Sequence, residues 1–296
     1  MTDHMVMDAI ETDGEWPIPP GRRLELPGRG TTFIREIAGP PGATPLLLHH
    51  GWGATGGLNW YRTFDRLADF RVIAPDVRGH GRGLRTRRVF RLADCADDSA
   101  ATLLELQAAP AIVAGYSMGG PISQLLWRRH RDLVGGLVLC ATSAGFFPGT
   151  RERMVMQGAM TALAGTLRVG TIASRIPFQV RPLRRSRHVS LPAWAQAEFR
   201  RHDLRMVAEA GHSIGTYHAP WIKEIDVPTV VVVTTNDHLV DPEQQYALAE
   251  AIPHARVIEI ESNHLACAEA EFVEPFVEAC RWVNARMAER SSSVAR

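Results

Sequence analysis

The chain has 296 residues, a hydrophobic fraction of 45% and a formal net charge of +1, so it can bury a sizeable core and has no charge excess that would favour nucleic acid or a membrane surface. The first twenty residues carry early acids and no apolar run, unlike a secretory signal, and no segment approaches the roughly 20 apolar residues that span a bilayer. We therefore expect a soluble, cytoplasmic protein without a stable membrane anchor and without a nucleic-acid partner.

The four cysteines are scattered and form no C-x-x-C pair, and none has a histidine at zinc-ligand spacing. We expect reduced thiols and no metal site. The sequence carries no signal for oligomeric state.

Short runs rich in Val, Ile and Leu recur along the chain and are typical of strands buried on both faces of a parallel sheet. The strand candidates are residues 31–37, 46–49, 71–75, 111–115, 135–141, 229–234 and 255–260. The first of them alternates more and fits an antiparallel edge strand. Helical patterns lie between the runs, at 92–108, 119–130, 243–251 and 272–288. This alternation predicts an α/β fold with a mostly parallel central sheet flanked by helices.

No convincing strand appears between about 146 and 222, where helical patches at 153–167 and 192–210 are interrupted by prolines. We interpret 146–222 as a helical cap inserted between core strands, with 1–145 and 223–296 forming the core. Apolar side chains of this stretch suit an acyl or aromatic group, and Phe146, Phe147 and Trp221 are the candidates for substrate contacts.

The strongest local motif is Gly115-Tyr116-Ser117-Met118-Gly119, which fits G-x-S-x-G between a predicted strand and a predicted helix. Such a turn holds the serine in a strained backbone, and its glycines let neighbouring segments approach without a Cβ in the way. The positive end of the following helix also favours negative charge that develops during attack. Ser117 is therefore the candidate nucleophile.

Two loops follow earlier strands. Residues 50–53 (HGWG) come after strand 46–49, where the backbone N–H of Trp52, together with that of Met118, would form an oxyanion hole. The side chain of His50 more often holds such a loop than does chemistry. His49 and His50 do not make a metal pair, because adjacent strand residues face opposite ways. Residues 76–81 (DVRGHG) follow strand 71–75.

These motifs, an Asp after a late strand and a His after the last strand together cover about 46 to 264, and over this span the chain resembles the α/β-hydrolase superfamily. The resemblance is to the branch with a serine nucleophile, which is carboxylesterase- or lipase-like. It implies that the D-x-R-G-H-G loop is structural and that the triad runs in the order serine, acid, histidine. His264, just beyond 255–260, is then the base, whereas His202 lies in the insertion and at most touches substrate.

Two carboxylates follow strand 229–234. Asp237 fits the acid position of the family pattern D-x-x-V-P, whereas Asp241 precedes Pro242 and is better interpreted as a helix N-cap. We favour Asp237 as the acid and keep Asp241 as the alternative.

The triad predicts a serine hydrolase that cleaves a small-molecule ester or acyl substrate through an acyl-enzyme on Ser117, with His264 as base and Asp237 as orienting acid. No cofactor is needed. The G-x-S-x-G turn is the nucleophile elbow of this fold. Its serine excludes the dehalogenases and epoxide hydrolases of the fold, which use aspartate at that position. Four alternatives stay open: a C–C bond hydrolase, a lyase or a perhydrolase with the same triad, and a non-catalytic ligand-binding member of the fold.

Overall fold

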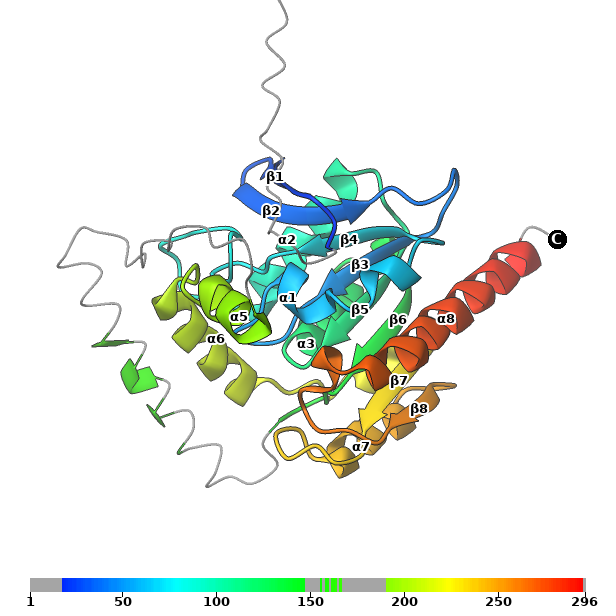
Figure 1. Ribbon diagram of the computed structural model, residues 1–296. Coiled ribbons are helices and arrows are strands. Elements are labelled where there is room, and N and C mark those ends of the chain that lie inside the picture. The colour runs from blue at the N-terminus through cyan, green and yellow to red at the C-terminus, as the bar shows by residue number, and fades with distance from the viewer. Residues whose placement is uncertain are drawn as a thin grey trace, which may run out of the picture.

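The computed structural model describes residues 18–146 and 190–294, together with residues 155, 158, 159, 161–163, 165 and 166 of a helical stretch. Within these residues, eight strands form one sheet in the order β1-β2-β4-β3-β5-β6-β7-β8 (Figure 1). Two antiparallel strands form one edge, β1 (Gly21–Leu26) and β2 (Gly30–Ile37). The other six run parallel: β3 (Pro45–His49), β4 (Arg71–Pro75), β5 (Ala111–Tyr116), β6 (Val134–Cys140), β7 (Thr229–Thr234) and β8 (Arg256–Ile260). The predicted, mostly parallel sheet is confirmed.

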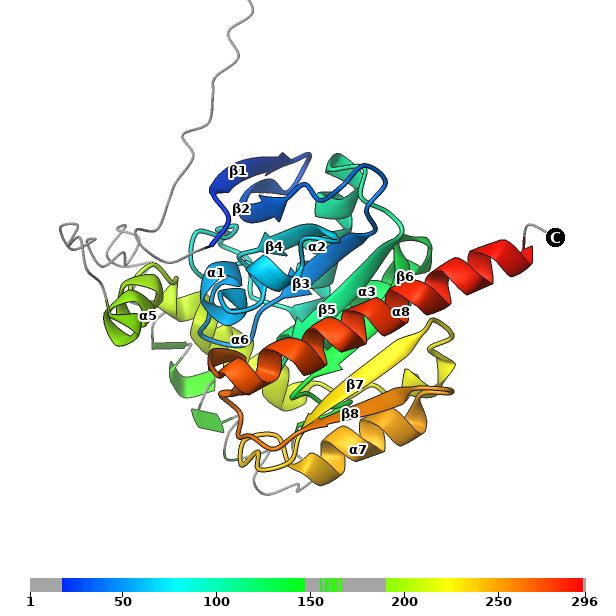
Figure 2. The ribbon, with the colours of Figure 1, turned by 45° about the vertical axis from the view of Figure 1, so that its right-hand side comes forward.

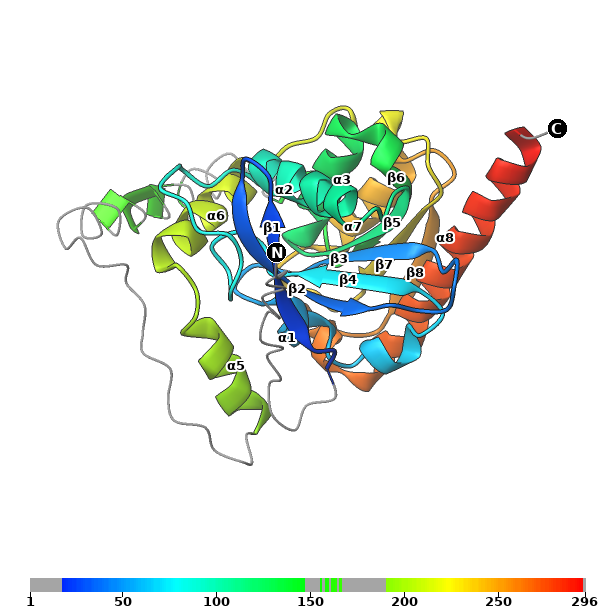
Figure 3. The same cartoon turned by 90° about the horizontal axis from the view of Figure 1, so that it is seen from above.

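Side chains along each strand alternate between two apolar layers. In β5, Ile112 and Ala114 pack in the layer shared with α1 (Gly56–Trp60) and α8 (Val273–Val294). On the other face, Val113 packs with α2 (Leu92–Glu105), α3 (Gly119–Arg129) and α7 (Pro242–Ala251). Figure 2 shows α8 crossing one face of the sheet. In the view from above in Figure 3, α8 lies on the opposite side of the sheet from α2 and α3. Burial on both faces explains why these strands are uniformly apolar.

Short 3-10 turns connect several elements. They are η1 (Phe64–Arg66), η2 (Arg131–Leu133), η3 (Ile222–Glu224), η4 (Ala266–Ala268) and η5 (Ala270–Phe272).

The structure differs from the sequence-based prediction in three elements. β1 is an additional strand, so β2 is antiparallel as predicted but is not the edge strand. α1 is an additional short helix. The predicted helix 192–210 is two helices, α5 (Leu191–Phe199) and α6 (Leu204–Thr216), because the side chain of Asp203 accepts a hydrogen bond from the N–H of Met206 and starts a new helix.

The carboxyl ends of the parallel strands meet at one edge of the sheet, and in such sheets ligands bind outside that edge. The loops after β3, β5, β7 and β8 carry the residues singled out in the sequence. Between β6 and β7, the described residues carry α5 and α6, which lie beyond the same edge (Figure 1).

Candidate active site

Ser117 sits at a sharp turn between β5 and α3, with its backbone in the left-handed region at φ +52°. Its N–H donates to the carbonyl oxygen of Cys140 at 2.9 Å, and its own carbonyl accepts from the N–H of Gly120 at 2.9 Å. A Cβ on Gly115 would collide with the carbonyl of Gly119, so the turn closes only with glycine there. The elbow presents a half-buried serine hydroxyl at the carboxyl edge of the sheet.

The imidazole of His264, in the loop after β8, bridges this serine and a carboxylate. Its Nε2 lies 2.9 Å from Ser117 Oγ, and its Nδ1 lies 2.7 Å from Asp237 Oδ2. An ionised carboxylate only accepts, so the Nδ1 proton points to Asp237 and the Nε2 lone pair faces the serine hydroxyl. The phenol of Tyr116 donates to the backbone carbonyl of His264 at 2.8 Å, which ties this loop to the end of β5.

The carboxylate of Asp237 is inaccessible to solvent. Burial on its own raises its pKa, but the hydrogen bond with His264 and those from the N–H groups of Val240 and Leu239 outweigh burial and lower the pKa below its ordinary value. The two N–H donors reach Oδ1 at 3.0 and 2.8 Å, and the hydroxyl of Thr234 donates to Oδ2 at 2.8 Å. The acid is therefore ionised and held in one orientation at neutral pH.

The second carboxylate candidate, Asp241, has a different partner. Its Oδ1 accepts from the N–H of Glu243 at 2.9 Å, and it is the N-cap of α7, with Pro242 in the first turn. The structure thus brings Asp237, rather than Asp241, into hydrogen-bond contact with the histidine.

The 50–53 loop faces the nucleophile, because a Cβ built on Gly51 would lie 3.5 Å from the Cβ of Ser117. The N–H of Gly51 is already used, since it donates to Asn59 Oδ1 at 3.0 Å. The N–H groups of Trp52 and Met118 have no hydrogen-bond partner within the part of the chain that the structure describes. Two open donors beside a serine are the arrangement that an oxyanion hole requires.

The neighbouring polar residues hold loops together. The N–H of Val77 donates to His50 Nε2 at 2.9 Å, so Nδ1 carries the proton and donates to the carbonyl of Gly51 at 2.8 Å. Burial, partly offset by Asp76, lowers the pKa of His50 to about 4. Asp76 accepts from the N–H of Gly56 at 2.9 Å and anchors the start of α1. Both side chains support the loops around the serine.

Of the three substrate-contact candidates, the structure describes Phe146 and Trp221. Phe146 is buried at the end of the described stretch after β6, and Phe147 lies outside the described residues. The ring of Trp221 stacks on Trp127, with ring centroids 6.0 Å apart. Trp127 belongs to the C-terminal half of α3, whereas the elbow is at the N-terminus of that helix, so the structure does not bring Trp221 together with the nucleophile.

His202 has a role that the sequence analysis missed. Its ring is buried, 2% exposed, and its Nε2 lies 2.9 Å from the carbonyl oxygen of Gly53, while the N–H of Gly81 donates to its Nδ1 at 2.7 Å. The sequence analysis gave His202 no role beyond a substrate contact, whereas both of its ring nitrogens are hydrogen-bonded to the backbone of core loops. These partners are more than a hundred positions away in sequence, so no local spacing signals them.

A second histidine also lies close to serines. His49 Nδ1 is 2.9 Å from Ser123 Oγ and its Nε2 is 2.8 Å from Ser99 Oγ. Its side chain is completely buried, and burial, followed by the neighbouring His50, lowers its pKa to about 3. The ring has serines rather than a carboxylate on both nitrogens, so it lacks the orienting acid of a triad.

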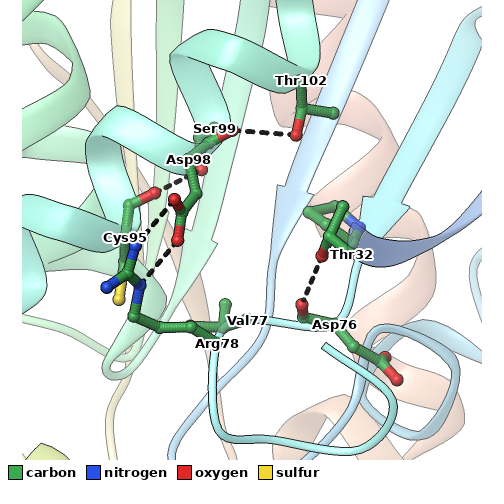
Figure 4. A pocket seen from close by; sticks show the side chains of 9 residues that line it. Thr32, Asp76, Val77, Arg78, Cys95, Asp98, Ser99 and Thr102 are labelled. Carbon is green, nitrogen blue, oxygen red and sulfur yellow. Dashed lines mark hydrogen bonds and ion pairs between the residues drawn. The ribbon is translucent and has the colours of Figure 1, made fainter. Parts of the chain in front are cut away.

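A small hollow with a volume of about 10 Å³ lies beside the 76–81 loop (Figure 4). Arg78 donates to both oxygens of Asp98 at 2.6 and 2.7 Å, and Thr32 Oγ1 donates to the carbonyl of Asp76 at 3.4 Å. The polar groups around this hollow engage one another, and no triad residue lines it. It belongs to the support of the loop rather than to the serine site.

Among the described residues, no three His, Cys, Asp or Glu side chains gather where they could hold a metal ion. Likewise, none of the helices in the described ranges is both long and apolar enough to cross a membrane.

Residues 44–271 match the family model of the alpha/beta hydrolase fold. The chain is 28% identical over 269 residues to a poly(3-hydroxyalkanoate) depolymerase of Ectopseudomonas oleovorans, which covers 86% of this chain and 90% of that protein. It is 32% identical over 123 residues to a pimeloyl-[acyl-carrier protein] methyl ester esterase of Vibrio cholerae, across 41% of this chain and 46% of that one. The solved structure of an enol-lactonase from Burkholderia xenovorans LB400 has a TM-score of 0.67 and 24% identity, covering 89% of this chain and 99% of its own; this likeness shows a shared fold.

Proposed function

We propose that this chain, which belongs to the α/β-hydrolase family and is an enzyme of that fold, hydrolyses carboxylic esters through an acyl-enzyme on Ser117. The observation that carries the proposal is the pair of hydrogen bonds made by His264. Its Nδ1 lies 2.7 Å from Asp237 Oδ2, and its Nε2 lies 2.9 Å from Ser117 Oγ. The relatives named above that match by sequence are a polyester depolymerase and a methyl ester esterase, which supports ester cleavage as the reaction class.

In the first half of the reaction, Ser117 Oγ attacks the ester carbonyl carbon while His264 Nε2 takes the hydroxyl proton. The N–H groups of Trp52 and Met118 hold the oxygen that becomes negative, and one such donor typically contributes about 3 kcal/mol to the transition state. The imidazolium returns its proton to the departing alcohol oxygen, which leaves an acyl group on Oγ. Asp237 stabilises the imidazolium and fixes the ring tautomer.

In the second half, His264 Nε2 takes a proton from water as the water oxygen attacks the acyl carbon. The same two donors hold the second oxyanion. The bond to Oγ breaks, the serine recovers its proton from the imidazolium, and the carboxylic acid leaves. Every proton that the base takes is returned within the same half-reaction, so the cycle needs no other co-reactant than water.

We further propose that 146–222 caps this site and that the acyl group is apolar. α5 and α6, the described helices of that stretch, lie beyond the carboxyl edge of the sheet. Large apolar side chains next to the site residues along the chain are also exposed: Trp52 is 45%, Leu239 70% and Leu265 66% accessible. Such exposed apolar surface near a serine site favours an acyl chain over a small polar ester.

The test is hydrolysis of p-nitrophenyl esters from acetate to palmitate, with a suspension of poly(3-hydroxyalkanoate) as a polymeric substrate, by wild type and Ser117→Ala. We expect wild-type turnover that the variant loses, and a rate that rises from acetate to longer acyl chains. Wild-type protein that reacts with a fluorophosphonate at Ser117 but cleaves no ester would refute ester hydrolysis. The same triad would then serve C–C cleavage, a lyase reaction or ligand binding.

A further inference from the structure

Two hydrogen bonds join the loop that faces Ser117 to the segment that contains α5 and α6. His202, between the two helices, donates from Nε2 to the carbonyl oxygen of Gly53 at 2.9 Å. The indole of Trp52 donates from Nε1 to the carbonyl oxygen of Val207, in the first turn of α6, at 2.8 Å. The two contacts lie on consecutive residues of the loop, Trp52 and Gly53, directly after the Gly51–Trp52 peptide unit that carries the N–H of Trp52.

The second hydrogen-bond partner of His202 determines which of its ring nitrogens carries the proton. Gly81 donates its N–H to Nδ1 at 2.7 Å, so Nδ1 must carry the lone pair and Nε2 the proton. Burial, partly offset by the hydrogen bond to Gly53, lowers the pKa of His202 below its ordinary value, which keeps the ring neutral. Both hydrogen bonds are shielded from water, because the residue is only 2% exposed.

The segment that carries His202 is itself fixed to the core. The N–H of Asp203 donates to the carbonyl of Gly79 at 2.8 Å, and the carboxylate of Glu209 accepts from the N–H of Phe90 at 2.8 Å. Arg205 pairs with Glu209 at 3.0 Å, and both side chains are buried. The start of α6 is therefore a rigid support rather than a swinging element.

We infer that His202 and the indole of Trp52 are positioning residues of the oxyanion hole, which hold the 50–53 loop so that the N–H of Trp52 points at the developing oxyanion. The inference rests on the proposed function. It makes the donor direction depend on the α5–α6 segment, whose two contact residues lie 149 and 155 positions away in the sequence. The α5–α6 segment would then contribute to the rate of the reaction as well as to the choice of substrate.

This role predicts a defined kinetic signature. The oxyanion exists in the transition state and not in the bound ester, so a misdirected donor lowers kcat and leaves KM nearly unchanged. A trifluoromethyl ketone, which adds to Ser117 as an oxyanion, should lose affinity by the same factor. A fluorophosphonate reports on the same hole whatever the natural substrate is, because its phosphoryl oxygen occupies it.

The experiment compares two substitutions of one residue. In His202→Asn the amide can still accept from Gly81 but is too short to reach Gly53, whereas in His202→Gln the longer amide can donate to Gly53. Trp52→Phe removes the indole donor and keeps an aromatic ring. The control is His254→Asn, outside the site and before β8, where φ is +63° and asparagine is well tolerated.

We expect His202→Asn and Trp52→Phe to lower kcat and the rate of fluorophosphonate labelling by about 10- to 100-fold, as displaced catalytic groups do, with KM within about twofold of wild type. His202→Gln should recover most of the loss, and His254→Asn should match wild type. Thermal unfolding confirms that each variant is folded.

Unchanged kcat and labelling rates in both folded His202→Asn and Trp52→Phe would overturn the inference, since the loop would then hold its own shape. A rise in KM alone would also overturn it, and would make these residues substrate contacts. If no protein hydrolyses the esters, the wild type included, the proposed function is contradicted instead. The rates of fluorophosphonate labelling would still decide the role of His202.

Discussion

Ser117 and Ser123 lie six residues apart, and each hydroxyl oxygen is 2.9 Å from a histidine ring nitrogen. His264, beside Ser117, has a carboxylate on its other nitrogen, and its side chain is 15% exposed. His49, beside Ser123, has a second serine on its other nitrogen and no exposed surface. The oxygen–nitrogen distance is the same in the two pairs, whereas the partner of the second ring nitrogen and the exposure of the histidine differ.

Under the proposed function, the difference means that a short serine–histidine distance is not sufficient for a nucleophile. A base has to become positively charged during the reaction, and a buried imidazolium without a counter-charge is strongly disfavoured. The pKa of about 3 for His49, caused first by burial, expresses that penalty. Asp237 removes the penalty for His264, because its ionised carboxylate lies 2.7 Å from Nδ1. Charge compensation and access distinguish the two pairs.

The two serine–histidine pairs should differ most when each serine is removed in turn. Ser117→Ala should lower kcat for ester hydrolysis by about 10⁴-fold or more, as losing a serine nucleophile does in other hydrolases. Ser123→Ala should change kcat by less than about threefold, because its hydroxyl has no access to substrate. Steady-state kinetics on a p-nitrophenyl ester measures both. Equal losses in two folded variants would contradict the distinction.

A second comparison is between the two neighbouring carboxylates. Asp237→Asn keeps the shape of the acid but loses its charge and favours the wrong histidine tautomer, so kcat should fall by about 10⁴-fold. Asp241→Ala removes only the N-cap of α7 and should cost about 1 kcal/mol of unfolding free energy with kcat nearly unchanged. Kinetics and urea denaturation of the two variants separate the effects. A large fall in kcat for Asp241→Ala alone would move the acid to that position.

The buried imidazole of His49 should affect how the free energy of unfolding depends on pH. The unfolded chain protonates His49 near its ordinary pKa of 6.5, whereas the folded chain does so only near 3. Its contribution to stability is therefore complete above pH 6.5 and is lost as the pH falls towards 3, with a slope of about 1.4 kcal/mol per pH unit. His49→Gln should reduce the slope of the unfolding free energy between pH 6 and 4 by about this amount, measured by urea denaturation.

Asp237 affects the free energy of unfolding in a lower pH range than His49. Its folded pKa is below the ordinary 3.8, so its contribution is present above that value and is lost as the pH falls through the lowered pKa. Between pH 6 and 4, Asp237→Asn should therefore leave the slope of the wild type intact. A slope that changes with Asp237→Asn and not with His49→Gln would show that the two windows are reversed.

Most of the sheet, and the places of Ser117, Asp237 and His264 after their strands, could be predicted because they depend on local pattern. An apolar run with a polar residue at its carboxyl end marks the serine after β5, the carboxylates after β7 and the histidine after β8, and a parallel sheet brings such ends to one edge. The choice between Asp237 and Asp241 was also local, since Pro242 identifies an N-cap.

The elements that were missed lack such a pattern. In β1, Arg22 and Arg23 interrupt the apolar run. α1 begins with Gly56 and Gly57, poor helix formers, and a Cβ on Gly56 would press on the backbone of Ala74. The role of His202 depends on bonds to the backbone of distant loops, which no spacing in the sequence encodes.

The left-handed backbone of Ser117, at φ +52°, carries a consequence for the history of such chains. For a residue with a Cβ this conformation costs roughly 1–2 kcal/mol, and glycine adopts it freely. Ser117→Gly should therefore raise the unfolding free energy by about 1 kcal/mol while abolishing turnover, as thermal unfolding and kinetics would show. If Ser117 is the nucleophile, as proposed, a descendant that kept the fold only to bind ligands would become more stable by replacing it with glycine, so at this position selection for chemistry would act against selection for stability.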